Sequence, residues 1–446
     1  MPQKKEAAPW IWGFIVMDLA VLERITLAIF YSPVTYNDTA SYRRLADAIA
    51  RGWVGYDGTR TPGFPVFMAL LGSDRRVYLA QLALGVLMTL AFYYLGYALT
   101  RRPVFGVLAA LVHTLNLGQL FFEADLITET LSTFFIVITL LGVFIWLTYP
   151  AHRHIILALA IGVTSGLAAL TRPLFIYLPF WIVLFLGFTF RDRTVKIAWK
   201  PLVAVVAPAL LLIGGWVLYI DHNYHMFSLT TMNGYHLMQH TGNFFEYVPE
   251  RDAALRDVYL RYRQQRIAEF GTQGNTIWDA IPEMQRVSGL SFYDLSRKLQ
   301  SISIDLILHH PDLYLKNVVT GWWMFWRAPV YWSAGVVLWP WLRGLLQGLV
   351  TVERVGLFGV NMLFLIVSVL LATWSRFRQS CRLSSFAWLV LGTIWLASIV
   401  QTLLDHGDNP RFLVPLQTWV VVWVLWAGYS LVKNGFWSRK KSGTVA

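Results

Sequence analysis

Acidic side chains stand beside hydrophobic segments of this chain, where acid–base chemistry on a membrane-bound substrate would need them. Asp38 follows shortly after the hydrophobic segment 10–30, and Glu123, Asp125 and Glu129 lie in "FFEADLITET" between two further hydrophobic segments. A carboxylate at a membrane boundary is partly desolvated, which disfavours its charged form and raises its basicity. Asp38 is therefore the candidate general base, and the other three acids are further candidates.

Some of these charges also have a structural interpretation. Asp125 would cap the helix that follows it, since acidic residues are favoured at helix N-termini, but this explains one carboxylate among three. In segment 10–30, the adjacent Glu23 and Arg24 would compensate each other or contact the lipid region. Asp18 is nearer the middle of the membrane and needs a buried partner.

Basic side chains are further candidates, because cationic groups bind anions through charge-assisted hydrogen bonds. The candidates are Arg60, Arg172 and Arg411, with His240 and Lys316 behind them. Arg172 lies in "LTRPLFIYLP", which joins two short hydrophobic segments with almost no loop. Two helices of about 16 residues cannot both cross the hydrocarbon and then turn in water. The turn is expected to be recessed, with the arginine facing an aqueous cavity or an anion; alternatively, the arginine extends to lipid headgroups.

The composition indicates what kind of protein carries these residues. Of 446 residues, 56% are hydrophobic, 15% aromatic and only 14% charged, whereas soluble domains carry about 25% charged residues. The hydrophobic residues fall in uncharged runs near the roughly 20 residues that cross a bilayer. This predicts an all-α polytopic membrane protein. The single cysteine, Cys381, excludes an intramolecular disulfide and a Cys-cluster metal site.

About ten transmembrane helices are predicted, and the N-terminus "MPQKKEAAPW" is expected to precede an uncleaved anchor. The ten segments are 10–30, 77–99, 103–122, 126–147, 155–170, 174–190, 202–220, 355–374, 386–404 and 412–432.

Alternation of these segments brings the short basic clusters to one face, which the positive-inside rule assigns to the cytoplasm together with both termini. The clusters are Lys4 and Lys5; Arg101 and Arg102; Arg153; Arg191, Arg193, Lys196 and Lys200; Arg376, Arg378 and Arg382; and Lys433, Arg439, Lys440 and Lys441. The net charge of +12 is therefore explained by topology, and no nucleic-acid partner is expected.

The opposite face carries the soluble mass. Its parts are a first outer loop (31–76) with an amphipathic helix after Asp38, a second outer loop (123–126), and a longer, mostly helical segment (221–354). Helices are expected in "DAALRDVYLRYRQQRIAEF" and in "YDLSRKLQSISIDLILHHPDLYLKNVV". The aromatic run "GWWMFWRAPVYW" is typical of a membrane interface. This divides the chain into an N-terminal transmembrane catalytic module (1–220), an outer-face domain (221–354) and C-terminal transmembrane helices (355–446).

Several of these motifs resemble those of the GT-C superfamily of integral-membrane glycosyltransferases, and within it the family of protein O-mannosyltransferases and the bacterial aminoarabinose transferase of lipid A. In the first outer loop the matching residues are "NDTASYRRLADAI" and "RTPGFPVF". The others are "EAD", "LTRPLFIYLP", "HHPDLYLKNVVTGWW" and "HGDNPRFLVPL", the last with Phe412 where the family has tyrosine. Family members often carry a second acid beside the first-loop Asp, and here the neighbours are Asn37 and Thr39. That departure puts a metal at Asp38 in doubt.

The resemblance implies a GT-C arrangement of the helices and a sugar donor attached to a polyprenyl phosphate at the outer leaflet. The acceptor would be a hydroxyl of a glycan, lipid or protein. Asp38 would act as base in an inverting transfer, with the basic candidates on the donor phosphate. Glu123 and Asp125 would hold a divalent cation (Mg²⁺ or Mn²⁺) or orient an arginine. The expected location is a bacterial cytoplasmic membrane, with the working face toward the periplasm or cell exterior.

Three other readings of the sequence stay open. A transporter or channel would be expected to show inverted repeats and polar groups near the midplane, but no repeat is seen and the acids gather at one face. A membrane scaffold without chemistry does not predict acids in both of the first two outer loops. The third is a GT-C enzyme of another acceptor class, such as one that adds arabinose or glucose to a cell-wall polymer.

Overall fold

The computed structural model describes residues 9–149, 154–190, 199–328, 330–404 and 409–434. Within these ranges the fold is all-α, as predicted, and extended backbone pairing is limited to two isolated bridges. Some basic residues used to predict the topology lie outside the described residues: Lys4, Lys5, Arg153, Arg191, Arg193, Lys196, Arg439, Lys440 and Lys441.

Seven of the described helices are long and apolar enough to cross a membrane, and the bent pair α5 (Pro103–Thr114) and α6 (Leu117–Ala124) adds an eighth if it counts as one span. The lengths and compositions of these helices identify the chain as a polytopic helical membrane protein. The seven are α4 (Asp74–Thr100), α7 (Glu129–Thr148), α9 (Leu178–Phe190) with the 3₁₀ turn η2 (Pro173–Tyr177), α10 (Trp199–Tyr224), α16 (Trp341–Thr373), α18 (Ser385–Leu404) and α19 (Val414–Lys433) with the 3₁₀ turn η6 (Asn409–Leu413).

The two remaining predicted spans also coincide with helices. α1 (Pro9–Phe30) contains the charged residues Asp18, Glu23 and Arg24. α8 (Ile155–Thr171) is a shorter apolar helix. Helices are therefore found at all ten predicted positions, while ten membrane crossings stay a prediction. Residues 341–354, assigned to the outer-face segment from the sequence, form the first part of α16.

The 51° bend between α5 and α6 is stabilised by two side chains that cap the start of α6. Asn116 is extended, and its side-chain oxygen accepts the N–H of Gln119 at 2.9 Å, which caps the start of α6. The carboxylate of Glu353 in α16 accepts the N–H groups of Leu117 and Gly118 at 3.0 and 3.3 Å. These acceptors satisfy N–H groups that a helix start leaves free. The restarted helix leads into the "EAD" sequence.

Connections that are far apart in the sequence meet at the two ends of the helical bundle. At one end, the N–H of Val34 donates to the carbonyl of Ala124 and the N–H of Leu126 donates to the carbonyl of Val34, both at 2.9 Å. At the other end, the amide of Asn434 after α19 donates to the carbonyl of Ser380 at 3.2 Å. In both examples, the two connecting segments were predicted to lie on the same face of the membrane, and they are neighbours in the fold.

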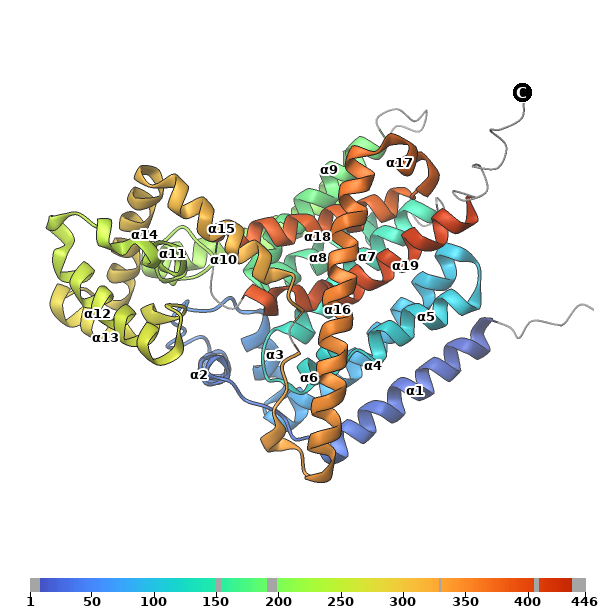
Figure 1. Cartoon of the computed structure of the whole chain (residues 1–446), viewed down its shortest axis with the longest axis horizontal. Helices are drawn as coiled ribbons and strands as arrows, with labels where there is room; N and C mark the ends of the chain where they lie inside the picture. Colours follow the sequence, from blue (N-terminus) through green and yellow to red (C-terminus); the bar gives the residue numbers. More distant parts are fainter. Residues whose placement is uncertain (1–8, 150–153, 191–198, 329, 405–408, 435–446) are drawn as a thin grey trace, which may run out of the picture.

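A separate helical unit contains most of the predicted outer-face segment and packs around its own core of apolar side chains (left in Figure 1). The predicted helix of 252–270 is found as α12, whereas the predicted helix of 293–319 is two helices, because Pro311 lacks the N–H that would continue the first. The unit comprises α11 (Asn233–Thr241), η3 (Gly242–Tyr247), η4 (Glu250–Asp252), α12 (Ala253–Phe270), α13 (Thr276–Ser288), α14 (Phe292–His309) and α15 (Pro311–Phe325).

The remaining elements are short. The predicted amphipathic helix after Asp38 is found as α2. The elements are α2 (Asn37–Ala50), α3 (Gly63–Leu71), the 3₁₀ turn η5 (Ala334–Val336) and α17 (Ser375–Cys381).

Candidate functional site

Asp38 lies in the first turn of α2, and its neighbour Thr39 ties that turn to the second outer loop. The hydroxyl of Thr39, which is fully buried, accepts the N–H of Tyr36 at 2.9 Å and donates to the carbonyl of Leu126 at 3.1 Å. The turn that carries Asp38 is therefore held against the turn that carries Asp125.

Two arginines from distant parts of the chain face the Asp38 carboxylate. Arg60 Nη2 lies 2.6 Å from Oδ1, and Arg411 Nη2 lies 3.5 Å from Oδ2. The three side chains are 21–28% exposed, so the group is accessible. Burial alone would raise the pKa of Asp38, but the positive charges of Arg60 and Arg411, with a smaller effect of His236, hold that pKa below its ordinary value. The expectation of a raised basicity at Asp38 is therefore wrong for the protein without ligand.

Glu129, the first residue of α7, is the second acidic centre and is fully buried. Its Oε1 lies 3.1 Å from Arg172 Nη1 and 3.0 Å from Arg411 Nε. The position at a helix N-terminus also favours a negative charge. Because Arg411 contacts both Asp38 and Glu129, the two ion pairs join into one network, which we call the arginine network: Arg60, Asp38, Arg411, Glu129 and Arg172.

Aromatic rings lie beside all three guanidinium groups of the network, and Arg411 is 5.9 Å from the centre of the Phe412 ring. Arg172 is 4% exposed and lies 4.3 Å from the centre of the Phe412 ring. Arg60 lies 5.6 Å from the centre of the Tyr42 ring. A guanidinium over an aromatic face gains electrostatic attraction and is fixed in orientation. The Arg172 side chain is thus enclosed by protein at the turn between α8 and η2.

Asp125 is fully buried at the end of α6. Gln81 fixes its turn by donating to the carbonyls of Asp125 and Glu123 at 2.9 and 3.0 Å. The Tyr36 side chain interacts with the carboxyl of Asp125, but neither carboxyl oxygen has a hydrogen bond of good geometry. Burial, with the negative charge of Glu129, raises the pKa of Asp125 well above its ordinary value. A raised pKa favours the neutral form of a carboxyl group, which can donate a hydrogen bond.

Glu123 belongs to a different cluster, which links α1 to α6. Arg24 Nε and Nη2 donate to the two carboxylate oxygens of Glu123 at 2.9 and 2.7 Å. Arg24 also pairs with Glu23 at 2.9 Å and bonds to the hydroxyl of Thr114. Gly85 of α4 lies so close that a Cβ there would collide with the Glu123 carboxylate. The charges of Glu23 and Arg24 therefore compensate each other, as expected, and Arg24 also compensates the charge of Glu123.

The candidates His240 and Lys316 are carried by the separate helical unit. His240 is buried in α11, where its ring centre lies 5.3 Å from that of Tyr314, and Lys316 is exposed on α15. One turn before His240, His236 is near enough for its charge to lower the pKa of Asp38. No motif in "NGYHLMQH" marks His236, so only its spacing from His240 offered a signal.

The charges of the arginine network determine what it can do chemically. Three guanidinium groups face the carboxylates of Asp38 and Glu129, so the network has one more cationic group than anionic groups. Guanidinium groups bind phosphate and carboxylate oxygens in charge-assisted pairs. The network is therefore suited to an anion, with a carboxylate at its accessible edge.

Comparison of the chain with protein-family models, with curated proteins and with solved structures gives no match. Its function therefore has to be inferred from the residues of the site.

Proposed function

We propose that the protein is a membrane-embedded glycosyltransferase that moves a sugar from a polyprenyl-phosphate donor to an acceptor hydroxyl of a glycan, lipid or protein. The observation that carries the proposal is the contact of Asp38 with Arg60 and Arg411. It brings a candidate base together with candidate phosphate ligands, in a chain whose helices are long enough to cross a membrane. A donor whose lipid lies in the bilayer would present its phosphate and sugar to these groups.

In the proposed reaction, Asp38 takes the proton of the acceptor hydroxyl as the hydroxyl oxygen bonds to the anomeric carbon. The bond from that carbon to the phosphate oxygen breaks, and the polyprenyl phosphate leaves with the electron pair. This direct displacement inverts the anomeric centre. A positioned general base contributes about 10²–10⁴-fold to such a step, and donors aimed at the leaving phosphate contribute the electrostatic part.

Donor binding would also prepare the base. Arg60 and Arg411 lower the pKa of Asp38 in the protein without ligand, which makes its carboxylate a weak base. A phosphate bound by the same two arginines would share their positive charge, so the pKa of Asp38 would rise. Glu129 would keep Arg172 and Arg411 oriented toward the phosphate.

The expected cation site at Glu123 and Asp125 does not fit these side chains as they lie. Both oxygens of Glu123 accept hydrogen bonds from Arg24, and Asp125 interacts with Tyr36 instead. Among the described residues, no group of three or more His, Cys, Asp or Glu side chains could hold a metal ion. The proposed mechanism therefore has no step through Mg²⁺ or Mn²⁺, and it gives Glu123 no catalytic role.

We further propose a bacterial cytoplasmic membrane as the location, with both termini in the cytoplasm and the arginine network facing the periplasm or cell exterior. The support comes from the positive-inside rule. The described basic residues that argue for this orientation are Arg101, Arg102, Lys200, Arg376, Arg378, Arg382 and Lys433, all outside the connections that carry the network.

The experiment that tests the function uses the purified protein in lipid nanodiscs with a panel of radiolabelled polyprenyl-phosphate sugars and a cell-envelope extract as acceptor. We expect the wild-type protein to transfer or hydrolyse one donor. This activity should be lost in Asp38→Asn and kept in Asp47→Asn. Asp47 is the matched control because it is an exposed acid of the same helix. A protein that leaves every donor intact but moves a solute across liposomes would be a transporter instead.

A further inference from the structure

A pocket with three amide side chains in its lining adjoins the turn that carries Arg411. Pro410 and Leu413, which flank Arg411 and Phe412, form part of its wall, whereas Arg411 itself contacts Asp38 and Glu129. The space in which the centre of a water-sized sphere fits is about 10 Å³, which is roughly the room that one hydroxyl group or water molecule needs, and the pocket is partly open to the surroundings.

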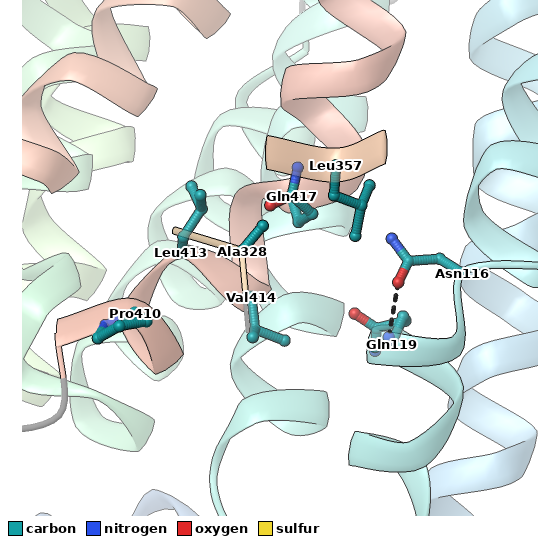
Figure 2. Close-up of a pocket in the computed structure, with 9 residues that line it drawn as sticks. Asn116, Gln119, Ala328, Leu357, Pro410, Leu413, Val414 and Gln417 are labelled. Carbon is teal, nitrogen blue, oxygen red and sulfur yellow. Dashed lines mark hydrogen bonds between the residues drawn. The ribbon is translucent and has the colours of Figure 1, made fainter. Parts of the chain in front are cut away.

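Three amides reach this pocket from two helices. Figure 2 shows Asn116 and Gln119 on one side and Val414 and Gln417 on the other, with Leu357 of α16 closing the top. Leu357 belongs to a helix that is largely uncovered in the structure, because only 22% of its apolar window is buried. The pocket therefore combines three amide groups with apolar side chains, one of which belongs to a helix that is mostly uncovered.

Gln119 points to a missing partner in this pocket. Its side chain is 3% exposed, and neither its amide nitrogen nor its amide oxygen has a hydrogen-bond partner. Buried polar groups in folded proteins are nearly always hydrogen-bonded, because an unpaired one loses its bonds to water without replacement. Since Gln119 lines the pocket, its partner has to enter there.

The neighbouring amides restrict what that partner is. Gln417 and Asn361 bond to each other at 2.8 and 3.3 Å, and Asn361 also donates to the carbonyl of Trp326 at 3.0 Å. No charged side chain of the described residues lines the pocket, so an ionic ligand would be buried without a counter-charge, at high cost. An amide offers both a donor and an acceptor, which a hydroxyl complements because it does both.

We propose that this pocket binds a neutral hydroxyl group, which hydrogen-bonds to the Gln119 amide. The hydroxyl belongs to a water molecule or to an alcohol that enters from the bilayer past α16. The inference does not depend on the glycosyltransferase proposal. A group held here would touch the residues on both sides of Arg411 and Phe412, so it would help to fix the turn that presents Arg411 to Asp38.

The test compares thermal unfolding of the wild-type protein and Gln119→Leu in lipid-free detergent micelles, with Gln347→Leu at an exposed glutamine as control. If a hydroxyl is bound, Gln119→Leu loses its hydrogen bond and Tm falls by about 2 °C or more relative to the control. An unchanged or higher Tm, both without additive and with added dodecan-1-ol, overturns the proposal, because removing an unpaired buried amide stabilises a protein.

Two further measurements identify the source of the hydroxyl. Added dodecan-1-ol, compared with dodecane, raises the Tm of the wild-type protein but not of Gln119→Leu if the ligand is an alcohol. If it is water, dodecan-1-ol has no such selective effect while the loss in Gln119→Leu persists. Should Gln119→Leu fail to fold, a high-resolution cryo-EM map of the wild-type protein in nanodiscs decides. Density within hydrogen-bonding distance of the Gln119 amide supports the proposal, and its absence overturns it.

Discussion

Arg411 Nε lies 3.0 Å from Glu129 Oε1, so a residue just before the last helix is bound to the first residue of α7. The same guanidinium reaches Asp38 at 3.5 Å. One side chain therefore links the accessible carboxylate to the buried one. A ligand that attracts Arg411 would weaken its contact with Asp38, while Glu129 keeps the guanidinium group in place.

Loss of Arg172 is expected to destabilise the fold strongly. Arg172→Met leaves Arg411 as the one ion-pair partner of the fully buried Glu129 among the described residues, and breaking a buried ion pair typically costs about 3–5 kcal/mol. Arg172→Met/Glu129→Leu should recover part of the loss, because the unpaired carboxylate is then gone. Denaturant unfolding in detergent measures both variants, with the exposed Arg376→Met as control. A loss in Arg172→Met no larger than in Arg376→Met would show that the pair contributes little.

The pH profile of the proposed transfer should have two different acid limits. The rate falls as Asp38 is protonated, so the acid limb of kcat/KM, which reports the free protein, should lie below the ordinary pKa of 3.8. The limb of kcat reports the donor complex and should lie at higher pH, because the phosphate shares the charges of Arg60 and Arg411. The same profile measured for His236→Gln shows whether the neighbouring imidazole contributes to the acid limb. If the acid limb of kcat lies at the same pH as that of kcat/KM or at a lower pH, the donor phosphate does not draw the arginines away from Asp38.

The stability of the folded protein should also depend on pH, because the pKa of Asp38 is lowered in the folded state. The pKa of Asp38 in the folded protein is below its ordinary value, so the contribution of Asp38 to stability is complete above pH 3.8 and is lost as the pH falls through the folded pKa. The difference in Tm between the wild-type protein and Asp38→Asn should therefore be constant near neutral pH and should shrink only in strong acid. A difference that already shrinks between pH 7 and 5 would show that the arginines do not hold the carboxylate.

The approach of α4 to Glu123 depends on the absence of a side chain at Gly85. Gly85→Ala would push a methyl group into the carboxylate that Arg24 holds, and overpacking of this kind typically costs about 1–3 kcal/mol. Gly356→Ala in α16 is the matched control, because a Cβ there has nothing within 4 Å. Thermal unfolding of both variants checks the prediction. Equal stabilities would mean that the Arg24–Glu123 pair shifts easily and does not fix the end of α6.

The helices were predictable from the sequence because the signal for each is local. Uncharged runs of the right length mark the segments that form α4, α7 and α18. Alternation of those segments also predicts that Asp38 and Arg411 share one face, as the ion pair between them bears out. The bend before α6 was missed because one of the side chains that stabilise it, Glu353, is far away in the sequence.

The partners of individual acids were harder to predict. Glu123 and Asp125 are two residues apart, and side chains at that spacing do not face each other on a helix, so Glu123 meets Arg24 while Asp125 meets Tyr36. The proximity of Glu123 to Arg24 depends on how α1 packs, which no local pattern records. The pKa of Asp38 was predicted in the wrong direction. Its burial could be anticipated from the sequence, but the combined opposite effect of the two neighbouring arginines could not.

The face that carries α2 can be determined by labelling. Cys381 is the single cysteine and is buried, so Cys381→Ala provides a background for new cysteines. Asp47→Cys on α2 should react with a membrane-impermeant maleimide in intact cells, whereas Gln379→Cys on α17 should react only after permeabilisation. Both positions are exposed in the structure, so a difference in labelling reports the side of the membrane. The reverse pattern would put the arginine network in the cytoplasm and remove a donor at the outer leaflet from the proposal.

Binding of the donor phosphate should depend more on the arginine network than on the basic side chains of the helical unit. Arg411→Gln removes a charge that faces Asp38 and Glu129, whereas Lys316→Gln removes one from the exposed surface of α15. Charge-assisted hydrogen bonds contribute about 1.5–3 kcal/mol each. The Kd for a polyprenyl-phosphate sugar should therefore rise about tenfold or more in Arg411→Gln and change little in Lys316→Gln, while the KM for the acceptor stays similar in both. Tryptophan fluorescence titration in nanodiscs measures the affinity, and circular dichroism checks that each variant is folded. A larger effect of Lys316→Gln would move the phosphate to the helical unit and leave Asp38 without a role as base.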